Sequence, residues 1–422
     1  MVTNSLMYNE AFIIIQKGKN NGIKWKTIIY GDPYIEFREI FMTDIIRRIG
    51  IAFVVGLMVF AAAISAGCID GDGETKRISL VKNGGQAMID GLQAETIDAM
   101  IGWEPWNANA IVDGHGYTYK NSSEIWPHHP CCVLAADYDW YSTTSDADEI
   151  MNRLVWVHMK TTEWINTAKA PGAANHSTLI SHAMDFTGRS EAIVEYALLN
   201  VDFDHTIGVD GMKTYTSKLD EYGILSGAKW GDSGYASTDA YVDDVIDNQY
   251  VTWAQSHANN DAADVALDIP VELRFGYLTA DLHQLAFWVA WNEGWFADVN
   301  ITVKESDSPQ YPREFVNGGA EMKEGFKLGE IDVGYLGTAP AMIFGINEND
   351  FLDTSPHYKE VTIKVIAGVN YDGSAIVIRS GLEVDSMKDL EGKTLGYPGP
   401  GTVQHFLVLM AAEQDGAKVQ EA

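Results

Sequence analysis

A sequence pattern that recurs at a constant offset of 234 residues constrains the fold of this chain most strongly. The segment 84–99 runs from a glycine pair through a methionine and a further glycine to an apolar end, and 318–333 repeats these positions. Each copy is typical of a glycine turn, a short amphipathic helix and an apolar strand. The strands end near 103–105 and 337–340, where a new helix can start. Glycine pairs alone recur by chance, but the shared register indicates two related α/β units.

The rest of the chain alternates short apolar runs with amphipathic stretches. We predict strands near 271–276, 299–303, 361–369, 375–378 and 394–397, and helices near 285–294 and 403–412. This alternation predicts an α/β fold with a mostly parallel sheet and helices on both faces. Residues 147–250 are instead predicted to be largely helical.

The composition excludes some partners and some classes of fold. The 422 residues have room for two lobes and carry a formal net charge of −30, so the protein and a nucleic acid repel each other. The chain has three cysteines, Cys68, Cys131 and Cys132, which are too few for a disulfide scaffold. We therefore expect a globular α/β protein that binds no nucleic acid.

A short apolar segment has the features of an export signal. Arg47 and Arg48 precede the apolar run 51–66, which is too short to span a bilayer comfortably and fits the apolar region of a signal peptide. Small residues lead directly to Cys68, which resembles the lipobox of bacterial-type and archaeal lipoproteins, whose cysteine is lipidated after cleavage. The alternative is a plain transmembrane anchor with an incidental cysteine. Both interpretations place the following residues outside the cell.

These features divide the N-terminal part of the chain. Residues 42–67 are predicted to be a lipoprotein signal peptide and residues 68–77 a flexible tether. Residues 1–41 are expected to be a non-native or mis-assigned extension, with Met42 as the true start, because a signal peptide normally begins its chain.

The remaining residues resemble the nitrate/sulfonate/taurine-type solute-binding proteins of ABC importers. The first half of that family is similar to the part of this chain from Val271 onward, through 275–278, 293–296, 329–340, 373–375, 389–393 and 398–404. The second half is similar to residues 78–250, through 97–99, 103–105 and 126–133. The resemblance implies a two-lobed clamp, the type II periplasmic-binding-protein-like fold.

The two halves stand in reversed order, which we interpret as a circular permutation. The smaller lobe is predicted to combine 78–138 with 384–422, and the larger lobe to comprise 139–383. The polar stretch 257–268 would join the family's former C-terminus to its former N-terminus, which is tolerated when those ends are neighbours on the surface. Two alternatives stay open: truncated halves that never pack together, and a swapped dimer.

Ligands of open α/β sheets bind where strands end and helices begin, and free N–H groups at helix N-termini suit anions. Three turns are therefore predicted to bind the solute: Gly337-Thr338-Ala339, Gly373-Ser374-Ala375 and Gly399-Pro400-Gly401-Thr402. The alternative is that they are ordinary turns and caps. By resemblance the loop 277–283 lines the cleft, with Tyr277, Thr279, Asp281 and His283 as candidate contacts, although Asp281 equally suits a helix cap.

Trp103 and Glu104 are the candidate contacts of the other lobe. Trp103 and the nearby Trp106 fit either core packing or an apolar wall over a ligand. Glu104 repels a bare anion and favours a ligand with a positive or hydrogen-bond-donating part, such as taurine or an aminopyrimidine.

One short segment is rich in metal-ligand residue types. His128, His129, Cys131 and Cys132 lack the separated pairs of a structural zinc site, and adjacent cysteines rarely bind one ion. We therefore predict that the two cysteines begin a buried strand that crosses between the lobes, and we expect no metal and no other cofactor. Outside the cell the pair can also oxidise to a vicinal disulfide.

The sequence thus predicts a binding protein that is lipid-anchored on the extracytoplasmic face of the membrane. It would deliver a small polar or anionic solute to the permease and ATPase subunits of an ABC importer. It shows no nucleophile elbow, phosphate loop or HExxH motif, so we do not expect an enzyme. The alternatives are a binding protein for a thiamine-type pyrimidine precursor, a surface sensor without transport and, less favoured, an enzyme resembling the thiamine pyrimidine synthases.

Overall fold

The computed structural model describes residues 5–8, 11–17, 23–29, 76–224, 235–307, 310–316, 318–347 and 363–421. The chain divides into two units, 1–74 and 75–422. In the first unit, β1 (Ser5–Tyr8), β2 (Ala11–Lys17) and β3 (Ile23–Ile29) form an antiparallel sheet. The predicted signal peptide and Cys68 lie outside the described residues. Within the described ranges, no helix combines the length and apolarity that crossing a membrane requires.

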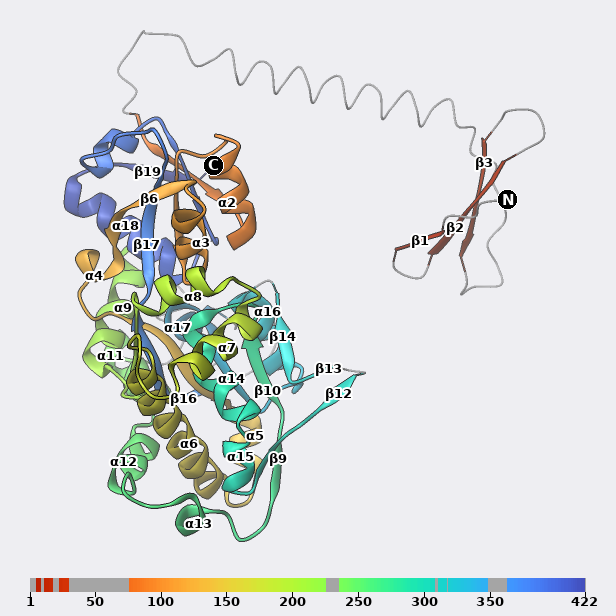
Figure 1. The fold of residues 1–422 in the computed structure, drawn as a ribbon, viewed down its shortest axis with the longest axis vertical. Helices are drawn as coiled ribbons and strands as arrows, with labels where there is room; N and C mark the ends of the chain where they lie inside the picture. Colours follow the sequence, from red (N-terminus) through yellow and green to blue (C-terminus); the bar gives the residue numbers. More distant parts are fainter. Residues whose placement is uncertain are drawn as a thin grey trace. The chain divides into compact units, whose positions relative to one another are not determined.

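The second unit contains two six-stranded sheets (Figure 1). The smaller sheet has the order β19-β4-β18-β5-β17-β6. Its strands are β4 (Ile78–Lys82), β5 (Ala99–Trp103), β6 (Gly116–Asn121), β17 (Ser374–Arg379), β18 (Thr394–Tyr397) and β19 (Val419–Glu421). The first four strands in this order are parallel, whereas β17 is antiparallel to both β5 and β6.

The larger sheet has the order β14-β10-β15-β7-β16-β8. Its strands are β7 (Pro130–Asp137), β8 (Val201–Phe203), β10 (Phe275–Leu278), β14 (Arg313–Phe315), β15 (Val333–Gly337) and β16 (Ile363–Asp372). Strand β10 is parallel to β14 and β15, whereas β7 is antiparallel to β15 and β16. The short strands β9 (Val271–Leu273) and β11 (Ile301–Val303), and β12 (Ser306–Asp307) and β13 (Gln310–Tyr311), form two separate pairs.

Both sheets are mixed, so the prediction of a mostly parallel sheet holds in part: β17 runs against the other strands of the smaller sheet, and β7 and β8 run against those of the larger. Strands β7 and β17 each follow a crossing from one sheet to the other, whereas β8, which is antiparallel to β16, does not. A chain that arrives from the opposite lobe enters the sheet from the junction side, so it runs against its neighbours.

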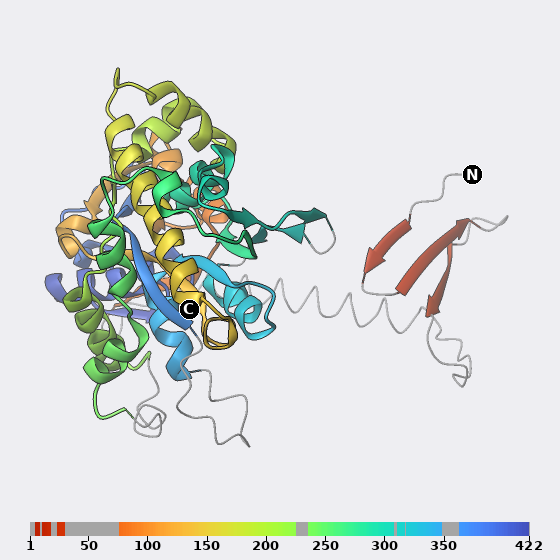
Figure 2. The ribbon, with the colours of Figure 1, turned by 90° about the horizontal axis from the view of Figure 1, so that it is seen from below.

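Helices cover the faces of both sheets. In the smaller lobe they are α2 (Gly85–Gln93), α3 (Trp106–Val112), α4 (Ser122–Ile125), η3 (Met387–Leu390) and α18 (Val403–Asp415). The predicted helical region 147–250 contains α6 (Ala147–Ala168), α7 (His176–Thr187), α8 (Glu191–Leu198), α9 (Val209–Glu221), α11 (Thr238–Val245) and the start of α12 (Gln249–Ser256). Helix α5 (Tyr138–Thr143) precedes this region. The others are α13 (Ala262–Val265), η1 (Leu282–Gln284), α14 (Leu285–Asn292), α15 (Trp295–Asp298), α16 (Gly319–Lys327) and α17 (Thr338–Asn347). Figure 2 shows the long yellow helix α6 beside the blue strand β16, with which it is in contact.

The repeat that the sequence shows is also a structural repeat. Helices α2 and α16, and strands β5 and β15, begin and end at positions separated by the same 234 residues. The glycines at the helix starts are needed for packing: a Cβ at Gly319 would lie 2.7 Å from Pro340, and one at Gly85 would overlap the ring of Trp106. In both units the missing side chain lets the next helix pack closely.

Within the described part of 75–422, the chain passes between the two sheets twice. One passage leads from β6 through 122–129 to β7, and the other leads from β16 through Gly373 directly into β17. Gly373 has φ +87°, a conformation that suits glycine. The predicted lobe boundaries need correction, because 130–137 belong to the larger sheet and 374–379 to the smaller one. Because β16 continues through a single residue into β17, the local sequence contains no signal that the chain changes lobe there.

The lobes share a continuous apolar core. Trp126 follows α4 of the smaller lobe, and its ring packs against Tyr215 of α9 and Phe406 of α18. The rings of Tyr215 and Phe406 are stacked with centroids 4.2 Å apart. The described conformation therefore has its lobes in contact.

Candidate functional site

Three loops meet where the two sheets adjoin. Glu104, directly after β5, donates its backbone N–H to the carbonyl of Gly373 (3.1 Å) and accepts one from Leu282, after β10, at its own carbonyl (3.2 Å). His283 Nε2 lies 3.0 Å from the same Gly373 carbonyl. The candidate site thus combines the ends of strands from both lobes with the passage between them.

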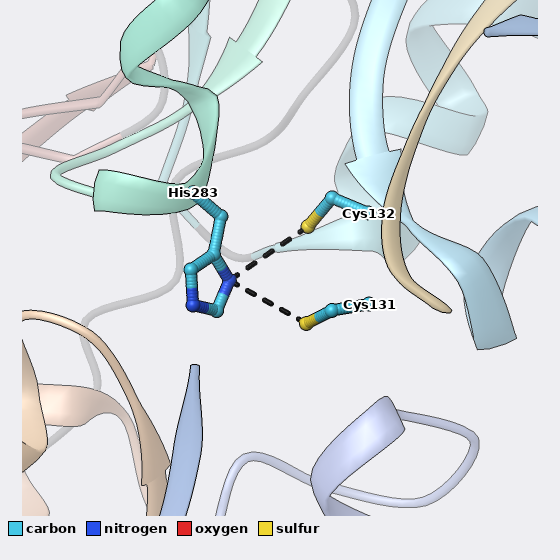
Figure 3. Close-up of side chains that lie close together, drawn as sticks. All are labelled: Cys131, Cys132 and His283. Carbon is cyan, nitrogen blue, oxygen red and sulfur yellow. Dashed lines mark hydrogen bonds between the residues drawn. The ribbon is translucent and has the colours of Figure 1, made fainter. Parts of the chain in front are cut away.

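His283 contacts both cysteines of β7 (Figure 3). Its Nδ1 atom lies 3.5 Å from Cys131 Sγ, 3.9 Å from Cys132 Sγ and 3.4 Å from Asp281 Oδ1. The side chain is buried, with 1% of it exposed, and both cysteines are also buried. Because the Gly373 carbonyl can only accept a hydrogen bond, it fixes a proton on Nε2 and directs Nδ1 at the sulfur atoms.

The electrostatics of this cluster favour a thiolate beside an imidazolium. Hydrogen bonding from Cys132, opposed by burial and aided by His283, holds the pKa of Cys131 well below its usual range. Burial alone lowers the pKa of His283, but the negative charges at Cys131 and Asp281 outweigh it and raise that pKa to about 10. The thiol of Cys132 then remains protonated, because the neighbouring thiolate raises its pKa.

Two buried carboxyl groups adjoin the cluster. Burial raises the pKa of Glu104 to about 7 and that of Asp281 to about 6. Both oxygens of Glu104 are occupied: one accepts the N–H of Ala108 in α3 (2.9 Å) and the other the amide of Asn200 (2.9 Å) from the opposite lobe. Glu104 therefore forms a hydrogen bond between the lobes and also caps α3.

The turns predicted from the sequence approach each other across the junction. A Cβ at Gly401 would lie 2.9 Å from Ile343 of α17, and one at Gly337 would lie 3.6 Å from Val403 of α18. The N-termini of α17 and α18 are thus close together. Thr402 caps α18 by accepting the N–H of His405 (3.1 Å), and its own hydroxyl donates to Gly399 (2.8 Å).

Two hydroxyl groups in the predicted ligand set are buried without a partner among the described residues. They belong to Thr338, at the first position of α17, and Thr279, in the loop after β10. Thr338 is fully buried, with 0% exposed. A buried hydroxyl without a hydrogen bond is costly and uncommon, so each of these two groups calls for a partner such as a ligand or an ordered water.

The other predicted residues have structural partners. Ser374 accepts a hydrogen bond from Gln404 of α18 (3.0 Å), and Asp281 caps η1 through the N–H of His283 (3.2 Å). Tyr277 packs in an aromatic group of the larger lobe. Trp103 packs in a separate apolar cluster of the smaller lobe to which Ala375 also belongs. Trp103 as a wall over the ligand stays a prediction.

The structure adds residues that the sequence did not mark as site residues. Asn200 and Gln404 have no local motif, and only the fold brings them to Glu104 and Ser374. The two described cavities lie away from the cysteine cluster. One, of about 410 Å³, is lined by three tryptophans of α6 and α15, and the other, of about 330 Å³, lies around Arg189.

Comparisons with known proteins agree with the fold. Residues 48–181 match the NMT1-like family. The nitrate/nitrite binding protein NrtA of a Nostoc species is 23% identical over 116 residues, which are 28% of this chain and 25% of that protein. The bicarbonate transport ATP-binding protein CmpC of a Synechocystis species is 42% identical over 53 residues, 13% of this chain and 8% of that protein. The nitrate import ATP-binding protein NrtC of Synechocystis is 32% identical over 77 residues, 18% and 11% of the two chains.

The matched segments are short, and the chain spans no more than 25% of the length of these relatives. The family match and the alignment with NrtA both fall on a chain whose structure has the two mixed sheets expected of a two-lobed binding protein. Over residues 48–181 the chain is thus similar to the NMT1-like family, and over 116 residues it is a distant homologue of NrtA.

Proposed function

We propose that this protein binds a small polar or anionic solute between its two lobes and delivers it to the permease of an ABC importer. The observation that carries the proposal is the buried hydroxyl of Thr338, which has no partner among the described residues. It lies at the start of α17, where that helix approaches the start of α18 from the other lobe. A solute atom there would receive the hydroxyl and the free N–H groups of a helix N-terminus.

The connections between the lobes suit a clamp. Within the described residues only two passages join the sheets, and one of them is a single glycine between two strands. Hinge closure of this kind needs a few residues that absorb a change in φ and ψ. Opening would separate Glu104 from Asn200 and expose the site, and a bound solute would favour the closed form by its contacts to both lobes.

The buried acids bear on the class of solute. A carboxylate beside an anion is repulsive, but the raised pKa values of Glu104 and Asp281 leave both groups partly protonated near neutrality. A protonated carboxyl group donates a hydrogen bond and no longer repels an anion. We therefore favour a small oxyanion or sulfonate, including taurine. The names of two relatives, which refer to nitrate and bicarbonate transport, support this class.

A binding screen on the purified chain tests the proposal. Nitrate, bicarbonate, alkyl sulfonates, taurine and a thiamine-type aminopyrimidine would each be titrated and followed by thermal shift and calorimetry. A ligand that binds the native state raises the melting temperature by mass action. One solute class should do so in the parent chain and much less in Thr338→Val. A shift of equal size in both chains would place the solute elsewhere, and no shift with any compound would contradict solute capture.

We also propose that the protein is anchored by a lipid at Cys68 on the extracytoplasmic face and partners with permease and ATPase subunits. The support is the lipobox-like sequence and the partial alignments to ATP-binding proteins of importers. Metabolic labelling with a radioactive fatty acid should mark the parent and not Cys68→Ser. Label that persists in the variant would contradict the anchor.

The permuted order is a further part of the proposal. Strand β18 pairs with β4 and β5, so segments from the two ends of 78–421 build one sheet within a single chain. A cysteine pair placed on α18 and β5, which are in contact, should form an intramolecular disulfide in dilute protein. A product that is only intermolecular would favour a swapped dimer.

A further inference from the structure

The two cysteines of β7 and a histidine more than a hundred residues away form a cluster with the chemistry of a metal site. The ligand atoms of Cys131, Cys132 and His283 all lie within 4.8 Å of one another, and 1%, 4% and 1% of these residues are exposed. The sulfur atoms come from β7 and the imidazole from η1, so the atoms converge from two elements of the larger lobe (Figure 3).

The spacing fits tetrahedral coordination. With metal bonds of about 2.3 Å to sulfur and about 2.05 Å to nitrogen, tetrahedral angles separate a sulfur and a nitrogen ligand by about 3.5 Å. Nδ1 of His283 lies 3.5 Å from Cys131 Sγ and 3.9 Å from Cys132 Sγ. An ion would therefore need only small movements of these side chains.

A β-bulge explains how two adjacent residues present their thiols to one histidine. Successive side chains of a regular strand point to opposite faces. In β7, Cys132 pairs with Asn370 and Pro130 pairs with Tyr371, so Cys131 is an extra residue without a partner on β16. A bulge of this kind redirects a side chain, and bulges are over-represented beside functional sites.

The surroundings of His283 orient it as a metal ligand. Its Nε2 faces the Gly373 carbonyl at 3.0 Å, so Nδ1, once it has lost its proton, directs a lone pair at the two sulfur atoms. Metal-bound histidines nearly always donate their second N–H in this way. Two thiolates and one imidazole favour a borderline-soft ion over Mg²⁺ or Ca²⁺, which prefer oxygen ligands.

We propose that Cys131, Cys132 and His283 bind one divalent ion of the Zn²⁺ class, with its fourth position open to a non-protein ligand. Binding would release two protons to solvent, one from the Cys132 thiol and one from Nδ1 of His283, so that the ion meets two thiolates and a neutral imidazole. The site is additional to solute capture, because Cys131 and Cys132 are not among the predicted solute contacts and His283 is the residue that the two sets share. Metal binding is measured without any solute, so its failure would leave solute capture untouched.

The test uses the full chain, reduced and freed of metal by a chelator that is then removed, and titrated with Co²⁺ as a spectroscopic substitute for Zn²⁺. One equivalent should produce a thiolate-to-cobalt charge-transfer band and the visible bands of tetrahedral cobalt, and Zn²⁺ should abolish both. The variants Cys131→Ser, Cys132→Ser and His283→Gln should bind at least about tenfold more weakly, since even loss of an outer hydrogen bond costs that much. Cys68→Ser removes the chain's other cysteine and should bind like the parent.

Each result decides the question. A parent chain with two free thiols at 131 and 132, shown by thiol titration after unfolding, but no charge-transfer band would overturn the proposal. The proposal would also be overturned by a charge-transfer band that only Cys68→Ser abolishes, or by a band that persists in both Cys131→Ser and Cys132→Ser. The titration of the parent chain tests metal binding without any variant, so the proposal can be refuted even if a variant fails to fold.

Discussion

Replacing Thr338 by valine should stabilise the protein and weaken its binding of solute at the same time. The two side chains have nearly the same shape, so the exchange removes the hydroxyl and leaves the packing of α17 intact. The hydroxyl is fully buried and has no partner among the described residues. A buried, unsatisfied polar group costs about 1–3 kcal/mol, and the added methyl group gains about 0.8 kcal/mol of burial. The free energy of unfolding without solute should therefore rise by about 2–4 kcal/mol.

The effect on binding has the opposite sign. A hydrogen bond from a hydroxyl to a charged ligand contributes about 1.5–3 kcal/mol, and each 1.4 kcal/mol changes an equilibrium constant tenfold. The dissociation constant for the solute found in the screen should rise by about 10- to 100-fold in Thr338→Val. Urea unfolding measures the first effect and calorimetry the second, on the same preparations.

Thr161→Val is the matched control. Thr161 is also fully buried, but its hydroxyl donates to the carbonyl of Val157 within α6 (2.7 Å). This variant should lose about 0.5–1.5 kcal/mol of stability and bind solute like the parent. If Thr338→Val were destabilised as much as Thr161→Val and kept full affinity, the Thr338 hydroxyl would be structural and the reasoning would be refuted.

Three further substitutions probe the junction. Burial raises the pKa of Glu104 to about 7, so its stabilising contribution is complete below pH 4.5, its ordinary value, and is lost as the pH rises through 7. The difference in free energy of unfolding between Glu104→Gln and the parent should therefore be about 3 kcal/mol more favourable to the variant above pH 7 than below pH 4.5. Urea unfolding measures it, and a difference that does not change with pH would contradict the raised pKa. Arg189→Ala removes a guanidinium that lies 4.3 Å from the ring centroid of a tryptophan in α3 of the other lobe. Without solute it should increase the radius of gyration in small-angle scattering, and an unchanged radius would show that this contact does not hold the lobes together. Gly373→Ala should lose more stability than Gly381→Ala. Both glycines have positive φ, which costs an alanine about 1–2 kcal/mol, but only a Cβ at position 373 would also overlap the imidazole of His283. Equal losses of stability in the two variants would argue against that packing.

Local pattern predicted the elements of the fold well. The repeated glycine turn, helix and strand appear as α2 with β5 and α16 with β15, and β18 coincides with the predicted 394–397. These elements depend on apolar periodicity and on glycines that allow close packing, and both features can be recognised from residues that are close together in the sequence. Pattern alone did not give strand direction or the lobe to which β7 and β17 belong. Strand order and direction depend on contacts between residues far apart in the chain.

The candidate site divides in the same way. The turns at 337–339 and 399–402 are predicted to bind the solute because glycine and threonine at a strand end are a local signal, and the structure brings these turns together. Asn200 contacts Glu104 although the two residues are 96 positions apart in the sequence, and no local motif predicts that contact.

The cysteine pair shows most clearly what each level determines. The sequence by itself determined a buried apolar strand that starts at adjacent cysteines, and the local spacing of those residues with two nearby histidines argued against a metal. The tertiary structure supplies a different histidine, His283, from a loop 151 positions beyond Cys132, and a bulge that turns both thiols toward it. Ligand geometry is a property of atoms in space, so sequence spacing decides it only when all ligands lie on one short segment.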